Sequence, residues 1–175
     1  MNYWWNLVTR SLLIVTCFSG CRHWGGTRSQ VRIGEAQYPL ATVQSYPGEV
    51  AFVQQVEGTL GEKSFQYNLQ GEIVSGEWAL VGLTPTGFRL FLLTMRDREI
   101  DYDPRWGFHL ELPPNLLLAA WQLAYWPEMT ALPPQVPGAV EIEMEGTSAW
   151  KGPVQVRIPD RELSLTFRTL MVESF

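Results

Sequence analysis

Hydrophobic and polar residues alternate with a period of two along much of the chain after residue 49. The clearest example is the segment 64–70, in which Phe65, Tyr67 and Leu69 alternate with polar residues without a break. This period puts the three side chains on one face, as in an antiparallel strand with one buried side. The same pattern predicts seven further strands, at residues 50–56, 78–84, 88–95, 99–103, 140–145, 154–158 and 163–169.

Short polar segments separate many of these predicted strands. Residues 61–63, 85–87 and 96–98 are typical of tight turns, so consecutive strands are expected to form hairpins. A sheet that is apolar on one face can bury that face by twisting strongly and curling round it. We therefore expect a mainly β fold with one or more short helices, built on a curled antiparallel sheet or incomplete β-barrel.

One segment, residues 113–127, breaks the alternation. Prolines bracket it at both ends, and within it only Asn115 and Gln122 are polar. A proline at the start and a proline after the end are typical of a helix. A helix that is apolar nearly all round is buried or lies in lipid, and about twelve residues are too few to span a bilayer. We expect this helix to pack into the concave side of the curled sheet.

The first twenty residues have the pattern of a secretory signal peptide. Arg10 supplies positive charge, and the apolar stretch that begins at Leu12 is shorter than the roughly 20 residues of a membrane span. Residues 18–21, Phe-Ser-Gly-Cys, resemble the bacterial lipobox, which implies cleavage between Gly20 and Cys21 and acylation of Cys21. Acylation at Cys17 is one alternative, and a soluble secreted protein with a chance cysteine is another.

The next segment, residues 21–37, is rich in Gly, Arg, Ser and Gln and has little periodicity. It is typical of a flexible tether, here lipidated at its start, although a strand around residues 31–33 is an alternative. The folded domain is then expected over residues 38–175. By resemblance to enterobacterial lipoprotein sorting, Arg22 in place of an aspartate implies the outer membrane. The protein would be anchored there by its acyl chains and face the periplasm.

Composition excludes several classes of protein. A hydrophobic content of 46% is too high for a disordered chain, and a net charge of −5 argues against nucleic acid as a partner. Two cysteines cannot build a disulfide framework or a cysteine-based zinc site. We expect no metal and no cofactor.

Candidate catalytic groups are few. The two histidines are His23, in the predicted tether, and His109, which is flanked by apolar residues, so a Ser-His-acid site would have to use one of them. The acidic residues 97, 99, 101 and 103 have the period of one strand face and could bind calcium or act as paired carboxylates. Arginines lie beside them, and we interpret this group, and the glutamates at 141, 143 and 145, as solvated strand faces. We therefore expect that the protein is not an enzyme.

Aromatic residues are abundant, with 8 Trp, 6 Tyr and 8 Phe. They are structural by default, but a half-barrel with an apolar concave face and an apolar helix is also how a lipid-binding cavity is built. The candidate acyl-cavity lining consists of Phe52, Phe65, Tyr67, Leu69, Leu90, Leu92, Leu117, Trp121, Trp126 and Phe167.

Three motifs carry a resemblance to a known family: residues 80–91 (LVGLTPTGFRLF), the helix ending in Tyr-Trp-Pro at 125–127, and residues 150–154 (WKGPV). In order and spacing they resemble an uncharacterised family of short proteobacterial lipoproteins, domain of unknown function 3261, over about residues 39–172. The family looks like a relative of the LolA/LolB lipoprotein carriers, whose open antiparallel barrel is lidded by helices and binds acyl chains. Members also occur with genes for aryl-polyene lipids. The resemblance implies lipid handling and supplies no catalytic residue.

Two functions follow as expectations. The first is an outer-membrane-anchored periplasmic lipoprotein, a monomer, that binds or transfers an acyl-chain ligand (a lipid, a lipoprotein or an aryl polyene) without covalent chemistry. The alternative is a lipid-anchored structural or interaction module of the cell envelope, with an envelope protein as partner. In that case the helix fills the barrel and leaves no room for a ligand.

Overall fold

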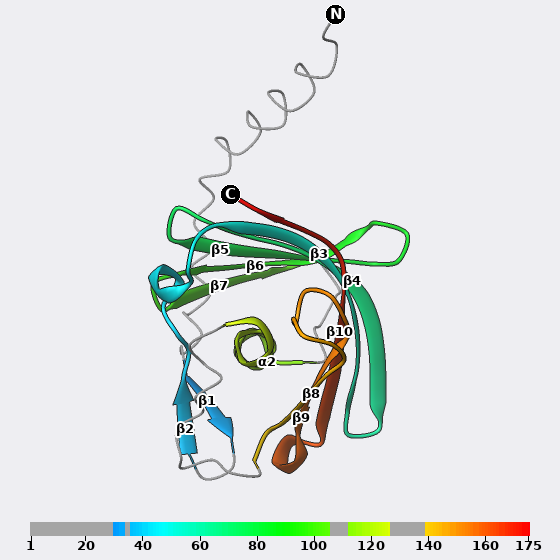
Figure 1. The fold of residues 1–175 in the computed structure, drawn as a ribbon. Helices are drawn as coiled ribbons and strands as arrows, with labels where there is room; N and C mark the ends of the chain where they lie inside the picture. Colours follow the sequence, from blue (N-terminus) through cyan, green and yellow to red (C-terminus); the bar gives the residue numbers. More distant parts are fainter. Residues whose placement is uncertain (1–29, 34–35, 106–111, 127–138) are drawn as a thin grey trace, which may run out of the picture.

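An eight-stranded antiparallel sheet forms most of the protein, in a computed structural model that describes residues 30–33, 36–105, 112–126 and 139–175 (Figure 1). The strand order is β7-β6-β5-β4-β3-β10-β9-β8, so the last long strand returns to pair with the first. The sheet curls and does not close into a barrel, which confirms the predicted mainly β architecture. The strands are β3 (Val50–Leu60), β4 (Lys63–Val74), β5 (Glu77–Leu83), β6 (Arg89–Arg96), β7 (Glu99–Pro104), β8 (Glu141–Met144), β9 (Val154–Ile158) and β10 (Leu163–Ser174).

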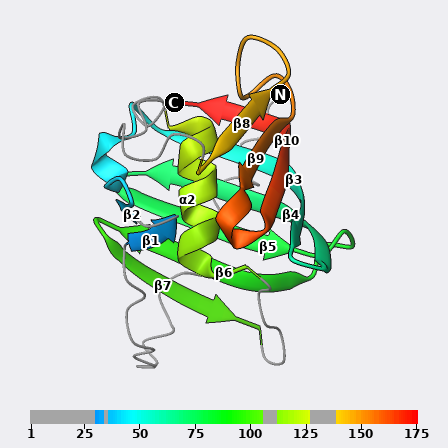
Figure 2. The ribbon, with the colours of Figure 1, turned by 90° about the horizontal axis from the view of Figure 1, so that it is seen from below.

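The predicted helix is present as α2 (Pro114–Tyr125) and lies in the concave side of the sheet (Figures 1 and 2). Pro114 opens it, where a missing N–H costs nothing, and the Trp126 N–H caps its end by donating to the Gln122 carbonyl at 2.8 Å. Nine of its twelve residues are buried, as expected for a helix with apolar residues all round.

A two-stranded hairpin, β1 (Gln30–Ile33) and β2 (Ala36–Pro39), is also part of the folded domain. The prediction of a tether over residues 21–37 is therefore wrong for its last part, and the alternative of a strand around residues 31–33 is right. Val31 and Ile33 are buried in the same core as the sheet, because the hairpin covers a side of α2 that the sheet leaves open. A short 3-10 turn, η2 (Val43–Ser45), connects the hairpin toward β3. The signal peptide, Gly20, Cys21 and Arg22 lie outside the described residues.

Three pairs of phenylalanine and glycine lie opposite each other on the concave face of the sheet. They are Phe52 with Gly71, Phe65 with Gly58, and Phe91 with Gly82. A β-carbon at any of these glycines would overlap the phenylalanine ring across from it. Each ring thus lies over the neighbouring strand at a site where only glycine leaves room. The pairs lie on β3, β4, β5 and β6, which belong to the sheet that curls round α2 (Figure 1).

Candidate functional site

The candidate site is the space between α2 and the concave face of the sheet, and Trp121 occupies its centre. This side chain is fully buried. Its ring stacks on Phe52 with centroids 4.9 Å apart, lies 4.7 Å from Trp78 and stacks on Tyr125 at 5.0 Å. The helix and the sheet are therefore in direct aromatic contact here, with no layer between them for a ligand.

A second set of rings extends this cluster toward both ends of the helix. Trp126 packs edge-on against Tyr46 at 4.9 Å, and Tyr125 lies 4.5 Å from Trp150. Residues 38–175 contain five tryptophans, and four of them meet in one cluster with α2 at its middle: Trp78, Trp121, Trp126 and Trp150. The fifth, Trp106, lies outside the described residues.

Hydrogen bonds fix the polar edges of these rings. The Trp121 indole N–H donates to the Gln54 side-chain oxygen at 2.9 Å, and the Gln54 amide in turn donates to the Thr169 hydroxyl at 3.3 Å. The Trp126 indole N–H donates to the Ser45 hydroxyl at 3.0 Å. Sequence analysis did not single out Gln54. Its signal was a polar residue in the apolar register of β3, between Phe52 and Val56.

The two polar residues of α2 both bind the N-terminal part of the domain. The Gln122 amide N–H donates to the Ala41 carbonyl at 3.0 Å, and its oxygen accepts the Ala41 N–H at 2.9 Å. The Asn115 amide donates to the Gln30 carbonyl at 3.0 Å. The polar positions that interrupt the apolar helix therefore hold both the first residue of the hairpin and the segment just after it against α2.

A Gln122→Leu variant should test this attachment. It should lower the free energy of unfolding by about 2 kcal/mol, because it leaves both backbone groups of Ala41 unpaired in a partly buried place. Thermal unfolding monitored by circular dichroism measures the loss. Asn115→Leu is the matched control, since its hydrogen bond is exposed and its loss should cost well under half as much. Equal losses in the two variants would contradict the role assigned to Gln122.

Two buried polar atoms on the concave face have no hydrogen-bond partner among the described residues: the Tyr67 hydroxyl and the Trp78 indole nitrogen. Burial raises the pKa of the Tyr67 hydroxyl, and the nearby Tyr102 raises it further. Tyr67 is therefore a neutral hydrogen-bond donor at physiological pH, not an anion.

Most of the predicted cavity-lining residues belong to this packed core. Phe65 and Leu90 are half-buried and pack against it. Leu92 is misplaced in the prediction: it pairs with Val81 and Asp103 and alternates with the buried Phe91 and Leu93, so its side chain lies on the outer face. The lining residues that are fully buried are Phe52, Tyr67, Leu69, Leu117, Trp121, Trp126 and Phe167.

Groups that could support catalysis do not come together in the described part of the chain. His23 and His109 lie outside it. The acidic side chains of β7 are exposed, and Asp103 forms an ion pair with Arg89 at 3.2 Å. Within the described residues no three histidine, cysteine or acidic side chains are grouped so that they could hold a metal ion.

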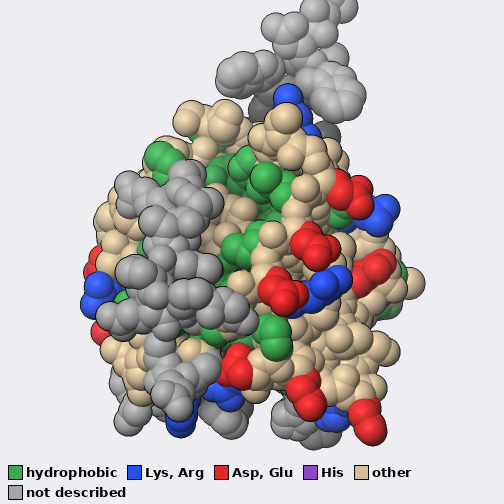
Figure 3. All heavy atoms as spheres, turned by 60° about the horizontal axis from the view of Figure 1, so that its bottom comes forward, with side chains coloured by type: hydrophobic (Ala, Val, Ile, Leu, Met, Phe, Trp, Pro, Cys, Tyr) green, Lys and Arg blue, Asp and Glu red, His purple; other side chains and the backbone are tan. Residues whose placement is uncertain are grey.

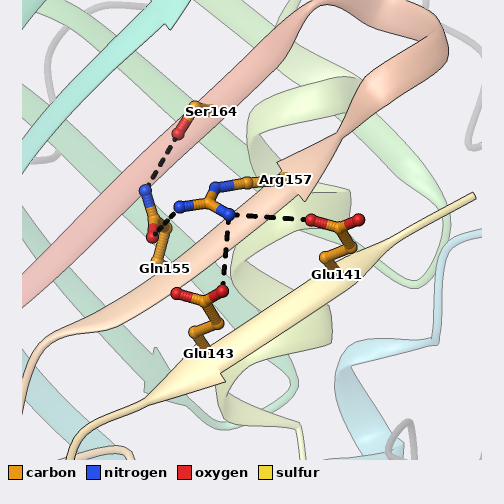
Figure 4. Close-up of polar contacts among 5 residues, drawn as sticks. All are labelled: Glu141, Glu143, Gln155, Arg157 and Ser164. Atoms are coloured by element: carbon orange, nitrogen blue, oxygen red, sulfur yellow. Dashed lines mark hydrogen bonds and ion pairs between the residues drawn. The ribbon is translucent and has the colours of Figure 1, made fainter. Parts of the chain in front are cut away.

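The most connected polar group is a surface network across β8, β9 and β10 (Figure 4). Arg157 on β9 lies 3.3 Å from Glu143 and 3.7 Å from Glu141, and donates to the Gln155 oxygen at 2.9 Å. Gln155 donates to the Ser164 hydroxyl at 3.2 Å. The network links the short edge strand β8 to β9 and β10, and its exposed ion pairs contribute little to stability.

Two hollows lie on the outer face of the sheet. The larger, about 560 Å³, is lined mostly by hydroxyl, amide and carboxylate side chains near the β3–β4 turn. The smaller, about 390 Å³, is lined by outward-facing residues of β3, β4 and β5, such as Ala51, Val53 and Val81, and by Met171. On the open side of the curled sheet, Figure 3 shows hydrophobic side chains beside a group of acidic and basic ones.

The fold and this packed interior define a mainly β domain wrapped round its own helix, and a family model covers two of the three sequence motifs, those at residues 80–91 and 125–127. The model of a family described as protein of unknown function (DUF3261) matches residues 51–148, which is more than half of the chain. The chain therefore belongs to this family. Comparison with curated proteins gives no match. Across the described segments there is no helix with the length and apolar character needed to cross a bilayer.

Proposed function

We propose that this protein is a lipid-anchored interaction module of the bacterial cell envelope, which acts by binding a partner and not by chemistry. The proposal takes Cys21 as the anchor and the periplasmic side of the outer membrane as the location, from the lipobox and Arg22. The observation that carries it is the position of Trp121, which fills the centre of the concave side in contact with Phe52 and Trp78.

Energetics favour this function over an interior acyl-chain site. Burying one large apolar side chain contributes about 1.5–3 kcal/mol, so removing six large apolar side chains of α2 and that of Trp126, which follows it, from the core would cost about 10–20 kcal/mol. An acyl chain that buries ten methylenes returns about 8 kcal/mol, which does not offset that cost. The seven buried side chains are Leu116, Leu117, Leu118, Trp121, Leu123, Tyr125 and Trp126.

An acyl-chain carrier is the second candidate, because of the buried Tyr67 hydroxyl and Trp78 indole N–H that have no partner among the described residues. Unpaired buried donors are costly and are explained if a ligand supplies the acceptor. In that function the carbonyl of an acyl ester or amide would accept from these donors, while part of α2 moves aside.

Titration with a fluorescent fatty acid and a fluorescent polyene separates the two functions. The protein without residues 1–21 should show no saturable binding to either probe. Saturable binding that weakens in Tyr67→Phe, a variant that removes only the donor, would reject the filled-interior proposal in favour of the carrier. Tyr38→Phe is the matched control, since Tyr38 is buried in the core but lies on β2.

The anchor is tested separately. A Cys21→Ser variant should accumulate as an unprocessed precursor without fatty acid, because the acylated side chain is gone. Metabolic labelling with radioactive palmitate, followed by membrane fractionation, measures both effects. Cys17→Ser should be labelled and processed like the wild type. If the label persists in Cys21→Ser and disappears in Cys17→Ser, the anchor has been assigned to the wrong cysteine.

A further inference from the structure

The second half of β10 is a free sheet edge. On one side β10 pairs with β3 along its whole length, up to Ser174 opposite Val50. On the other side β9 pairs only with residues 163–167, and Val154 opposite Phe167 is its last partner. Residues 168–174 therefore have no paired strand on that side in the described structure, and they form the rim of the sheet (Figure 2).

This edge carries the largest group of exposed apolar side chains among the described residues. Leu170, Met171 and Val172 are 59%, 48% and 39% exposed, and the neighbouring Phe175 is 73% exposed. Natural proteins protect free edges with lysine, proline or very short strands, because an open strand is a template for pairing with another chain. Residues 168–174 contain no lysine and no proline. A bulge between Thr169 and Met171 and the charged Arg168 and Glu173 near the two ends of this segment are its protective features, but the apolar residues 170–172 between those charges stay exposed.

The backbone of this segment has groups directed toward the free side. The Phe175 N–H donates to the Glu49 carbonyl at 3.1 Å, on the β3 side. Because bonding directions alternate along an antiparallel strand, the N–H and C=O of Val172 and Ser174 point the other way. Val172 thus offers one donor and one acceptor to an added strand.

The charged side chains on this edge differ from those on the other two edges of the sheet. The outward residues of β7 are Glu99, Asp101 and Asp103, and β8 carries Glu141 and Glu143. Arg89 pairs with Asp103 and Arg157 with both glutamates, but two copies paired through β7 or through β8 would still place more acidic than basic side chains against each other, which is destabilising. The free part of β10 instead has Arg168 at its start and Glu173 near its end, opposite the outward-facing Gln55 and Ala51. Antiparallel pairing of two such segments places the arginine of each copy toward the glutamate of the other.

We propose that residues 168–174 of β10 pair antiparallel with the same segment of a second copy, joining the two sheets into one. The apolar side chains at residues 170–172 cover each other, and the two Arg168–Glu173 contacts set the antiparallel direction. The pairing replaces the monomer expected from the sequence. It does not depend on the proposed function, because an acyl carrier would have the same edge.

Cysteine cross-linking of the full-length protein in cell membranes tests the contact. In a Cys17→Ser background that keeps the Cys21 anchor, a mild oxidant should convert Met171→Cys to a disulfide-linked species of twice the mass. Phe88→Cys, at an exposed turn, and Ile142→Cys, on the β8 edge, are the matched controls and should stay monomeric. Equal cross-linking in either control, or a product that contains a different protein, would overturn self-pairing through β10.

Two further variants, studied by sedimentation of the detergent-solubilised full-length protein, test the mechanism of pairing. Val172→Pro removes an edge-facing N–H without breaking the β3 ladder and should abolish the dimer. Arg168→Glu should weaken the dimer about tenfold, and the double variant Arg168→Glu/Glu173→Arg should restore it. A dimer unchanged in both single variants, or a wild type that stays monomeric at about 100 µM, rejects the proposal, since even millimolar affinity would leave a detectable dimer fraction there. The two charge variants, Arg168→Glu and Arg168→Glu/Glu173→Arg, still test the pairing if the proline variant fails to fold.

Discussion

A Trp121→Ala variant is expected to unfold with a free energy about 3–5 kcal/mol lower than that of the wild type. The side chain is fully buried and contacts rings from α2, β3 and β5, so its removal leaves a cavity that the rigid sheet cannot close. It also leaves the buried Gln54 oxygen without its donor. For a domain of this size the loss should lower the melting temperature by about 6–20 °C, measured by circular dichroism on the protein without residues 1–21.

Phe88→Ala is the control for this prediction, because Phe88 is a large aromatic residue that is 62% exposed at the β5–β6 turn. It should change the stability by less than about 0.5 kcal/mol. A Trp121→Ala protein that unfolds like the wild type would mean that the space round Trp121 is already open. Taken with saturable fatty-acid binding in the wild type, that result would support the carrier function instead.

The sheet was the most predictable part of the fold, because its strands bury one face and expose the other. Period two therefore identified all eight strands of this sheet, and the polar turn segments indicated the hairpins β3–β4, β5–β6 and β6–β7. The strands are longer than predicted at β3 and β4. Gly58 and Gly71 interrupt the apolar pattern of these strands, yet both continue through the glycines, whose missing side chains leave room for Phe65 and Phe52.

The N-terminal hairpin was not predictable as part of the domain from periodicity alone. Only Val31 and Ile33 alternate in β1, too short a run to distinguish from a tether rich in polar residues. Tertiary contacts hold the hairpin in place. Asn115 binds the backbone of the hairpin, Gln122 binds that of Ala41 just after it, and the hairpin covers a side of α2 that the sheet leaves open. A local sequence pattern cannot show such long-range partners.

The sequence predicted which residues meet at the candidate site, but not whether they enclose a cavity or fill it. The apolar helix, the inward strand residues and the tryptophans are those that meet on the concave side. Whether they enclose a cavity or fill it depends on ring packing such as that of Trp121 on Phe52, which sequence does not specify. The error at Leu92 has a local cause. The bulge between Gly82 and Leu83 shifts the register of β6, so the apolar run 90–93 does not tell which alternate residues face inward.

The second large effect is expected at Gly71, where the sheet has no room for a single methyl group. An alanine side chain there would overlap the Phe52 ring and lie 2.6 Å from a Leu80 methyl group. Because Phe52 stacks on Trp121, it cannot move without breaking the contact between the sheet and α2. Gly71→Ala should therefore lower the free energy of unfolding by about 2–3 kcal/mol, measured by urea denaturation.

The rescue of this variant identifies the cause. In a Phe52→Leu background the shorter side chain leaves space for the new methyl group, so Gly71→Ala should cost much less than it does alone, a coupling of at least about 1 kcal/mol. Ala79→Val is the matched control, because Ala79 lies on the neighbouring strand and lines the open hollow on the outer face, where added methyl groups meet no core atoms. It should leave stability nearly unchanged. If Gly71→Ala cost the same with phenylalanine or leucine at residue 52, the glycine would matter for some reason other than the ring across from it. In that case the three phenylalanine–glycine pairs would not explain how the sheet curls round its helix.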